Sequence, residues 1–195
     1  MKLQFIGTGS GKTSLKRNHS SILISASNHN LLIDAGDGIS KALLAQNINY
    51  NSIDSILFTH YHADHFSGIA SLITQMKLTT RKSLLTIYTH KKLIEPLKSF
   101  LNNCFLFEEK FGFDFKIIGF TKNEKAIVNA EINFTARKNS HIKKKHELKN
   151  YKRTNFLSFS FYIEAGKKKI IYTSDIGSEE DLFLFKEIEP DYFIT

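Results

Sequence analysis

The stretch that decides the fold is residues 56–68, Ile-Leu-Phe-Thr-His-Tyr-His-Ala-Asp-His-Phe-Ser-Gly. Three histidines and one aspartate fall within six positions of it: His60, His62, Asp64 and His65. A strand-like apolar run, residues 53–59, precedes them, and a helical pattern follows. Loops between such elements often carry functional side chains on a rigid scaffold, so we expect these four residues to act together.

The chemistry of this cluster favours metal binding. His60 and His62 are two positions apart, so both can point the same way from an extended loop, while Asp64 and His65 follow where the chain turns into the predicted helix. Imidazole nitrogen and carboxylate oxygen suit zinc, and also manganese or iron. One loop can therefore supply two ligand pairs for two adjacent metals. A loop that is rich in histidine by chance is the alternative, which the regular spacing disfavours.

The helix after the cluster shows its apolar residues at helical spacing, on one face: Phe66, Ile69, Ala70, Ile73 and Met76. Further helices are predicted over 39–47, 90–103 and 179–186, with Asp37 as a cap of the first. The glycine-rich segment Gly7–Lys12 is a tight turn beside the metal site. It is not a phosphate-binding loop, because that motif needs a glycine where Ile6 stands. His19, His29 and His90 are expected to be structural.

The pattern His60-x-His62-x-Asp64-His65 resembles the signature of the metallo-β-lactamase superfamily. Segments 7–11 (Gly-Thr-Gly-Ser-Gly), 32–38 (Leu-Ile-Asp-Ala-Gly-Asp-Gly) and 67–68 (Ser-Gly) look like its ribonuclease Z branch. The resemblance implies an α/β fold of the metallo-β-lactamase type, an αββα four-layer sandwich. It implies one domain over residues 1–195, incomplete at the C-terminus, with the last strands and helix missing.

The same resemblance assigns further site residues. His141 looks like the third histidine of the first metal, beside His60 and His62. Asp175 looks like the aspartate that bridges both metals, and Asp64 and His65 complete the second site. Asp64 is also assigned as catalytic, and Asp34 as a support for the metal loop that binds no metal itself. The alternatives are a surface role for His141, ligation by His146 in its place, and helix capping by Ser174 or Asp175.

The family has one more histidine ligand, and no residue after Asp175 is a histidine. We expect from this that the 195 residues are part of a longer chain. A degenerate relative with a lopsided metal site is the alternative.

The resemblance implies a hydrolase with two divalent metals, expected to be zinc, in which a metal-bridging hydroxide attacks a phosphoryl group. The family activity is endonucleolytic removal of the 3′ trailer from precursor tRNA, so a phosphodiesterase acting on RNA is the leading interpretation. Hydrolysis of a lactone, a thioester or a cyclic nucleotide is an alternative, as is a non-catalytic remnant that binds metal or RNA.

Basic residues gather in residues 137–153, which hold eight lysines and arginines against the single acid Glu147. This run begins beside His141, so it is expected to contact a polyanionic substrate, with Tyr151 available for stacking on a base. The residues assigned to substrate binding are Lys143, Lys144, Lys145, Lys149, Lys152 and Arg153. A solvated loop without a ligand is the alternative.

The overall composition is that of a globular protein, with 42% hydrophobic residues and a net charge of +8. Cys104 is the only cysteine, so no internal disulfide can form, which fits a cytoplasmic location. The N-terminal apolar run is too short for a signal peptide. No run approaches the roughly 18 apolar residues of a membrane span, so no membrane partner is expected. Relatives are commonly dimers, which makes a homodimer an expectation.

Overall fold

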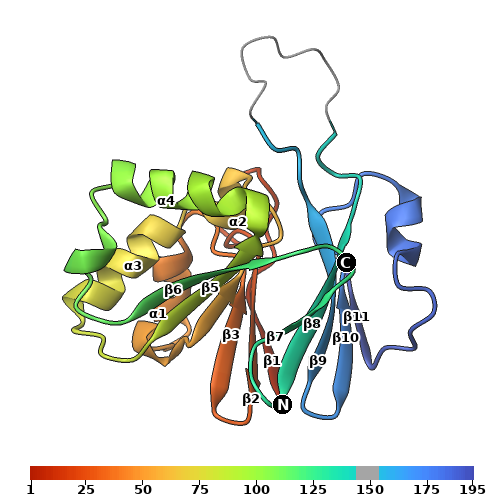
Figure 1. Cartoon of the computed structure of the whole chain (residues 1–195), viewed down its shortest axis with the longest axis horizontal. Coiled ribbons are helices and arrows are strands. Elements are labelled where there is room, and N and C mark those ends of the chain that lie inside the picture. Colours follow the sequence, from red (N-terminus) through yellow and green to blue (C-terminus); the bar gives the residue numbers. More distant parts are fainter. Residues whose placement is uncertain (144–153) are drawn as a thin grey trace. The chain divides into compact units, whose positions relative to one another are not determined.

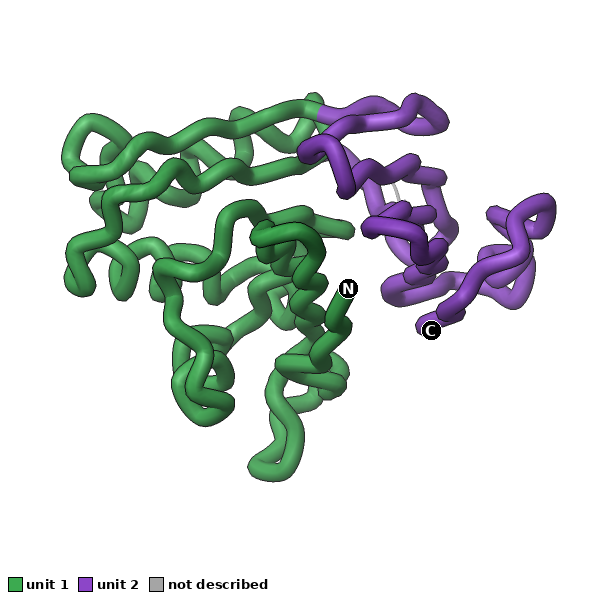
Figure 2. The backbone as a smooth tube through the Cα atoms, turned by 90° about the horizontal axis from the view of Figure 1, so that it is seen from below, with its two compact units in different colours: residues 1–119 green, residues 120–195 purple. Residues whose placement is uncertain are grey.

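The computed structural model describes residues 1–143 and 154–195. Contacts divide the chain into two compact units, residues 1–119 and residues 120–195 (Figure 2). Most of the predicted basic substrate contacts lie outside the described residues, together with His146 and Tyr151: Lys144, Lys145, Lys149, Lys152 and Arg153. That residues 1–195 act as one domain stays a prediction.

The first unit is built on a mixed sheet. Its strands are β1 (Lys2–Gly7), β2 (Ser21–Ala26), β3 (His29–Ile33), β4 (Ser55–Leu57), β5 (Leu85–His90) and β6 (Phe115–Phe120), which pair in that order. β1, β2 and β3 form an antiparallel meander, whereas β3, β4 and β5 are parallel. The loops after these three parallel strands therefore leave the same edge of the sheet.

Helices cover one face of this sheet (Figure 1). They are α1 (Ile39–Ala45), α2 (Ala63–Phe66), α3 (Ile69–Leu78) and α4 (Ile94–Asn103), with short 3₁₀ turns η1 (Tyr50–Ser52), η2 (Lys91–Leu93) and η3 (Glu108–Lys110). The predicted apolar face is buried at Phe66, Ile69, Ile73 and Met76. The helix itself is interrupted between α2 and α3, where Gly68 passes close to the backbone of Gly36.

The second unit contains a smaller sheet. Its strands are β7 (Lys125–Ile127), β8 (Ile132–Lys138), β9 (Phe159–Ala165), β10 (Lys168–Tyr172) and β11 (Tyr192–Ile194), in the order β11-β10-β9-β8-β7. β10 and β11 are parallel and the other neighbours are antiparallel. The rings of Phe120, Phe134, Phe159 and Phe161 meet edge to face in its core.

Two predictions of local structure are wrong. The segment 179–186 is a 3₁₀ turn, η4 (Glu179–Phe183), rather than an α-helix, because its backbone bonds connect residues three apart and its Asp181 side chain is drawn into a neighbouring loop. Asp37 does not cap α1, since Gly38 holds the cap position without a side-chain bond. No helix in the described ranges is long and apolar enough to cross a bilayer.

Candidate metal centre

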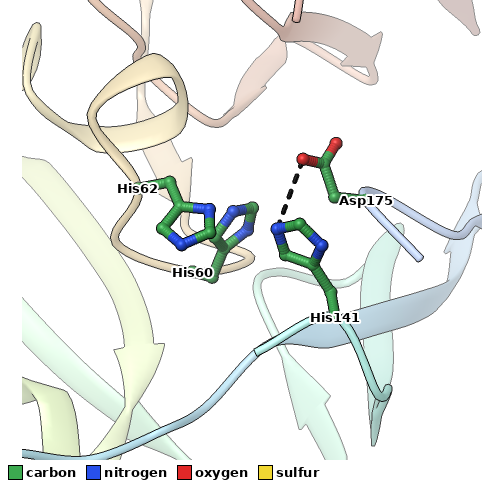
Figure 3. Close-up of side chains that lie close together, drawn as sticks. All are labelled: His60, His62, His141 and Asp175. Atoms are coloured by element: carbon green, nitrogen blue, oxygen red, sulfur yellow. Dashed lines mark ion pairs between the residues drawn. The ribbon is translucent and has the colours of Figure 1, made fainter. Parts of the chain in front are cut away.

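The loop between β4 and α2 carries the cluster that the sequence predicts. His60 and His65 are fully buried, Asp64 is partly buried and His62 is exposed at the start of α2. The ring centroids of His60 and His62 lie 4.7 Å apart, and those of His60 and His65 lie 4.2 Å apart. His60 and His62 project from this one loop (Figure 3). The structure thus brings the four predicted residues of the first unit together.

Asp34 supports this loop, as the resemblance implies. It follows β3 with no exposed surface. One carboxylate oxygen accepts from the Thr59 amide at 2.8 Å, and the other accepts from the Thr59 hydroxyl at 2.8 Å and from His65 Nδ1 at 2.7 Å. Burial raises the pKa of Asp34, while the interactions with His65 and Thr59 oppose that rise. The ionised form of Asp34 therefore depends on its hydrogen bonds with His65 and Thr59.

This hydrogen-bond chain sets the tautomers of two imidazoles. The Thr59 hydroxyl gives its proton to Asp34, so it accepts from His60 Nδ1 at 2.9 Å. His65 donates to Asp34 through Nδ1 as well. Both rings then carry their lone pair on Nε2, which is the form that binds a metal. His65 Nε2 lies 3.6 Å from a carboxylate oxygen of Asp64, so these two donor atoms face a common position.

Glycines let the backbone close tightly around the loop. A Cβ on Gly36 would lie 1.9 Å from the Asp64 carbonyl oxygen, and one on Gly68 would lie 2.1 Å from that of Gly36. The Ala35 amide donates to the His65 carbonyl at 2.7 Å. The Gly7–Lys12 turn also passes beside the cluster, because a Cβ on Gly11 would lie 3.4 Å from an Asp64 carboxylate oxygen. Its predicted position is confirmed.

The remaining histidines of the first unit hold local structure. His19 Nδ1 pairs with the Ser10 carbonyl at 2.9 Å and thereby fastens the glycine turn. His29 Nε2 contacts the Ser55 hydroxyl at 2.8 Å, and His90 Nδ1 accepts from the Lys92 amide at 3.2 Å. These contacts agree with the structural roles that we predict for them.

The second unit brings the other two predicted ligands together. His141 follows β8 and Asp175 follows β10, and His141 Nε2 lies 3.4 Å from an Asp175 carboxylate oxygen (Figure 3). Lys143, the one described residue of the predicted substrate contacts, is exposed, and its charge contributes to lowering the pKa of Glu180, after a larger effect of the Ser178 hydroxyl. Asp175 does not cap η4, since Ser178 does so through a capping box with Asp181.

The donor chemistry in each unit fits a divalent metal. In the first unit, ligand atoms of His60 and His62 lie within 4.8 Å of one another, as do those of Asp64 and His65. In the second unit, the same holds for His141 and Asp175. Such sets of imidazoles and carboxylates are typical of zinc sites. The sequence interpretation missed the residues that hold these ligands, namely Thr59, Asn139, Ser140 and Asp181. Only Asp181 had a local signal, as the acid three positions after Ser178.

Comparisons with known proteins agree with this architecture. A family model described as anti-Pycsar protein Apyc1 matches residues 1–194. Ribonuclease Z of Methanosarcina mazei is 36% identical over 88 residues, which cover 45% of this chain and 29% of the relative. Ribonuclease Z of Saccharolobus islandicus is 36% identical over 117 residues, which cover 60% of this chain and 38% of the relative. The chain thus spans about a third of the curated relatives that it matches.

Two solved structures have a similar fold. The metallo-β-lactamase fold protein YhfI from Bacillus subtilis superimposes with a TM-score of 0.76 at 20% identity, covering 99% of this chain and 69% of that one. Human tRNase Z, short form, gives a TM-score of 0.68 at 20% identity, covering 88% of this chain and 68% of that one. The predicted metallo-β-lactamase fold and the similarity to ribonuclease Z are confirmed.

Proposed function

The chain belongs to the anti-Pycsar protein Apyc1 family, and from this premise we propose that it is a metal-dependent hydrolase of phosphodiesters. The observation that carries the proposal is the Asp34 network. A fully buried carboxylate holds His65 directly and His60 through Thr59, in the tautomer that offers Nε2 to a metal. In a metal site such a network strengthens metal binding, because an imidazole that is held in position is a stronger ligand.

The proposed centre would hold two divalent ions, most simply zinc. His60 and His62 from the first unit and His141 from the second would bind one ion. Asp64 and His65 from the first unit would bind the other, and Asp175 from the second would contribute an oxygen to each. When bound, such ions stabilise negative charge on an attacked group and lower the pKa of a bound water.

A phosphodiester is the substrate class that the surrounding residues favour. The curated relatives are named ribonuclease Z, and the basic run 137–153 begins at the approach to His141. Lysines and arginines next to a hydrolytic centre attract a phosphate backbone. Hydrolysis adds water to phosphorus and breaks one ester bond, so that the departing alcohol takes a proton. RNA with a 3′ trailer is the leading substrate under this proposal.

A small cyclic phosphodiester is the second candidate, favoured by one feature of the sequence. The glycine- and proline-rich arm with which ribonuclease Z holds tRNA has no counterpart, because no proline occurs between Pro96 and Pro190. Without such an arm, contacts near the metals would have to bind the substrate, and these suit a compact nucleotide better than a folded RNA.

A chromogenic phosphodiester, bis(p-nitrophenyl) phosphate, tests the reaction class. We expect zinc-dependent turnover by the purified chain. His62→Ala and Asp64→Ala should each lower kcat by more than the roughly 10–100-fold that loss of a residue supporting a ligand costs. His29→Ala is the matched control, since that ring bonds to Ser55 outside the cluster. Unchanged rates in His62→Ala and Asp64→Ala would sink the proposal.

A substrate panel then separates the candidates. Precursor tRNA and cyclic nucleotides are compared at several salt concentrations, since contacts to a phosphate backbone weaken steeply with salt. If the chain hydrolyses a lactone or thioester, and the rate changes neither with Lys143→Ala nor with the salt concentration, the substrate is a carbonyl compound instead. RNA binding that survives chelation, without any turnover, would point to a binding module.

A further inference from the structure

We propose that Asp181 and Asn139 are positioning residues that hold His141 and Asp175 ready for a metal. The inference rests on the proposed function, and it concerns the second unit alone. His141 lies on the loop after β8 and Asp175 on the loop after β10. β9 separates these two strands in the sheet, so the ladder between neighbouring strands does not connect the two loops. The two loops are connected through side chains.

Asp181 provides the first connection. Its buried carboxylate accepts from the Ser140 amide at 3.0 and 3.1 Å and from the Ser140 hydroxyl at 2.8 Å. It also accepts from the Gly177 amide at 2.8 Å. Ser140 directly precedes His141, and Gly177 is two residues after Asp175. A single carboxylate thus fastens both ligand loops by their backbones.

The charge state of Asp181 suits this role. Burial would raise its pKa, but the donors of Gly177, Ser140 and Ser178 together outweigh burial and lower the pKa below its ordinary value. The side chain is therefore a carboxylate that only accepts hydrogen bonds. An amide in its place would present an N–H to donors that already point inward.

Asn139 provides the second connection. Its Oδ1 accepts from the His141 amide at 3.3 Å, and its Nδ2 donates to the Asp175 carbonyl at 3.1 Å. The same Nδ2 lies 3.3 Å from the Thr173 carbonyl oxygen. The side chain is 3% exposed, so these bonds are sheltered from water. One amide joins the backbone of one ligand to the backbone of the other.

The close approach of the two loops adds a third observation. A Cβ on Gly177 would lie 2.2 Å from the Ser140 carbonyl oxygen and 2.7 Å from the His141 amide. Only glycine permits this spacing. The loops are therefore packed against each other and hydrogen-bonded through Asp181 and Asn139, which keeps His141 Nε2 3.4 Å from the Asp175 carboxylate.

Zinc affinity of the full chain, measured by competition with a chromophoric chelator, tests the inference. We expect Asp181→Asn and Asn139→Ala to weaken zinc binding by about 10–100-fold. Ser140→Ala removes only one donor to Asp181 and should give a smaller loss, which keeps the test open if Asp181→Asn folds poorly. Asp191→Asn is the matched control, because that carboxylate also accepts a backbone amide, from Lys169 at 2.8 Å, but at the start of β11.

A double-mutant cycle separates positioning from a general effect on folding. If Asp181 acts through His141, then His141→Ala costs less zinc affinity in the Asp181→Asn background than in the wild type. The visible spectrum of the cobalt-loaded chain should also change in Asp181→Asn and stay unchanged in Asp191→Asn. Additive effects with an unaltered cobalt spectrum would show a merely structural role.

The outcomes also separate this inference from the proposed function. A wild-type chain that binds zinc while Asp181→Asn and Asn139→Ala bind it equally well overturns the positioning role and leaves the proposed function standing. A wild-type chain that binds no zinc overturns both.

Discussion

At the scale of single residues, each unit has a buried carboxylate that holds the segments carrying the predicted ligands. Asp34 bonds to His65 and to Thr59, while Asp181 bonds to Ser140 and Gly177. The two differ in what they hold, since Asp34 fixes an imidazole ring and Asp181 fixes backbone amides. A substitution at Asp34 should therefore act on the tautomer of a ligand as well as on its position.

We predict that Asp34→Asn weakens zinc binding by about 10–100-fold, the usual cost of losing a carboxylate that orients a ligating imidazole. Both oxygens of Asp34 accept hydrogen bonds, whereas asparagine is neutral and has only one accepting oxygen. It therefore cannot accept all the bonds from Thr59 and His65. Zinc competition measures the effect, and Asp37→Asn serves as the control, because Asp37 is exposed, directly precedes the α1 cap residue Gly38, and has no bond to Asp34 among those that define the network. Equal affinities of wild type and Asp34→Asn would refute the proposed role.

The residues of the metal loop could be predicted because their signal is local. His60, His62, Asp64 and His65 stand within six positions, and the spacing alone indicates metal chemistry. His141 and Asp175 could be assigned as ligands only from the resemblance to the metallo-β-lactamase superfamily, since no neighbouring residue indicates metal binding. Asn139 and Asp181 were missed because their partners lie 36 and 41 residues away in the sequence. Such pairings depend on the strand order, which the sequence alone does not reveal.

At the scale of elements, Arg81 fixes the connection between α3 and β5. Its guanidinium is 2% exposed and donates to the carbonyl oxygens of Ser83 at 2.8 Å, Asn51 at 3.2 Å and Leu84 at 2.7 Å. Burial lowers its pKa, and nearby Asp54 opposes this effect. Two carbonyl groups of this connection, and that of Asn51 in η1, therefore depend on one side chain.

We expect Arg81→Met to lower the free energy of unfolding by about 3 kcal/mol, because buried carbonyl oxygens that lose their donor are costly. Urea denaturation measures the change. Lys82→Met is the matched control, since Lys82 is exposed and adjacent, and it should shift the free energy by no more than about 0.5 kcal/mol. Equal stability of the two variants would contradict the role given to Arg81.

The sheet of the second unit carries an ion pair across its surface, between β7 and β9. Glu164 accepts from Lys125 Nζ at 2.7 Å and from the Tyr162 hydroxyl at 2.9 Å. The bond from Lys125, followed by that from Tyr162, lowers the pKa of Glu164 to about 2. Its folded pKa lies below its ordinary value, so its stabilising effect is present above that value and is lost as the pH falls towards 2.

We predict that Lys125→Met raises the pKa of Glu164 towards its ordinary value, measured by NMR titration of its carboxyl carbon. Lys168→Met should leave it unchanged, because Lys168 pairs with Asp191. A Glu164 pKa that stays near 2 in Lys125→Met would contradict the leading role given to Lys125.

Elements were predicted well where apolar periodicity is strong and less well where side-chain bonds decide. The helices predicted over 39–47 and 90–103 are present as α1 and as η2 followed by α4, because their apolar residues recur at helical spacing. β4 is shorter than its apolar run, because Phe58 and Thr59 already belong to the loop that turns towards His60. The 3₁₀ turn at 179–183 was expected to be a helix, and the bonds of Asp181 explain the difference.

At the scale of the whole molecule, the predicted ligands are divided between the two compact units. The first unit supplies His60, His62, Asp64 and His65, and the second supplies His141 and Asp175. We propose that these six residues bind two metal ions. The fold could be predicted from the motif, whereas the substrate could not, because the same ligands serve several kinds of ester hydrolysis.

The most direct test is the zinc content of the dialysed chain, determined by elemental analysis for wild type, His62→Ala, His141→Ala and Asp175→Ala. We predict about two equivalents in the wild type, as in other centres with two ions. His62→Ala and His141→Ala should each fall to about one, because both are proposed ligands of the same ion, and Asp175→Ala should lose part of both. A wild-type chain without zinc, or a His141→Ala chain that keeps the full wild-type content, would contradict the account.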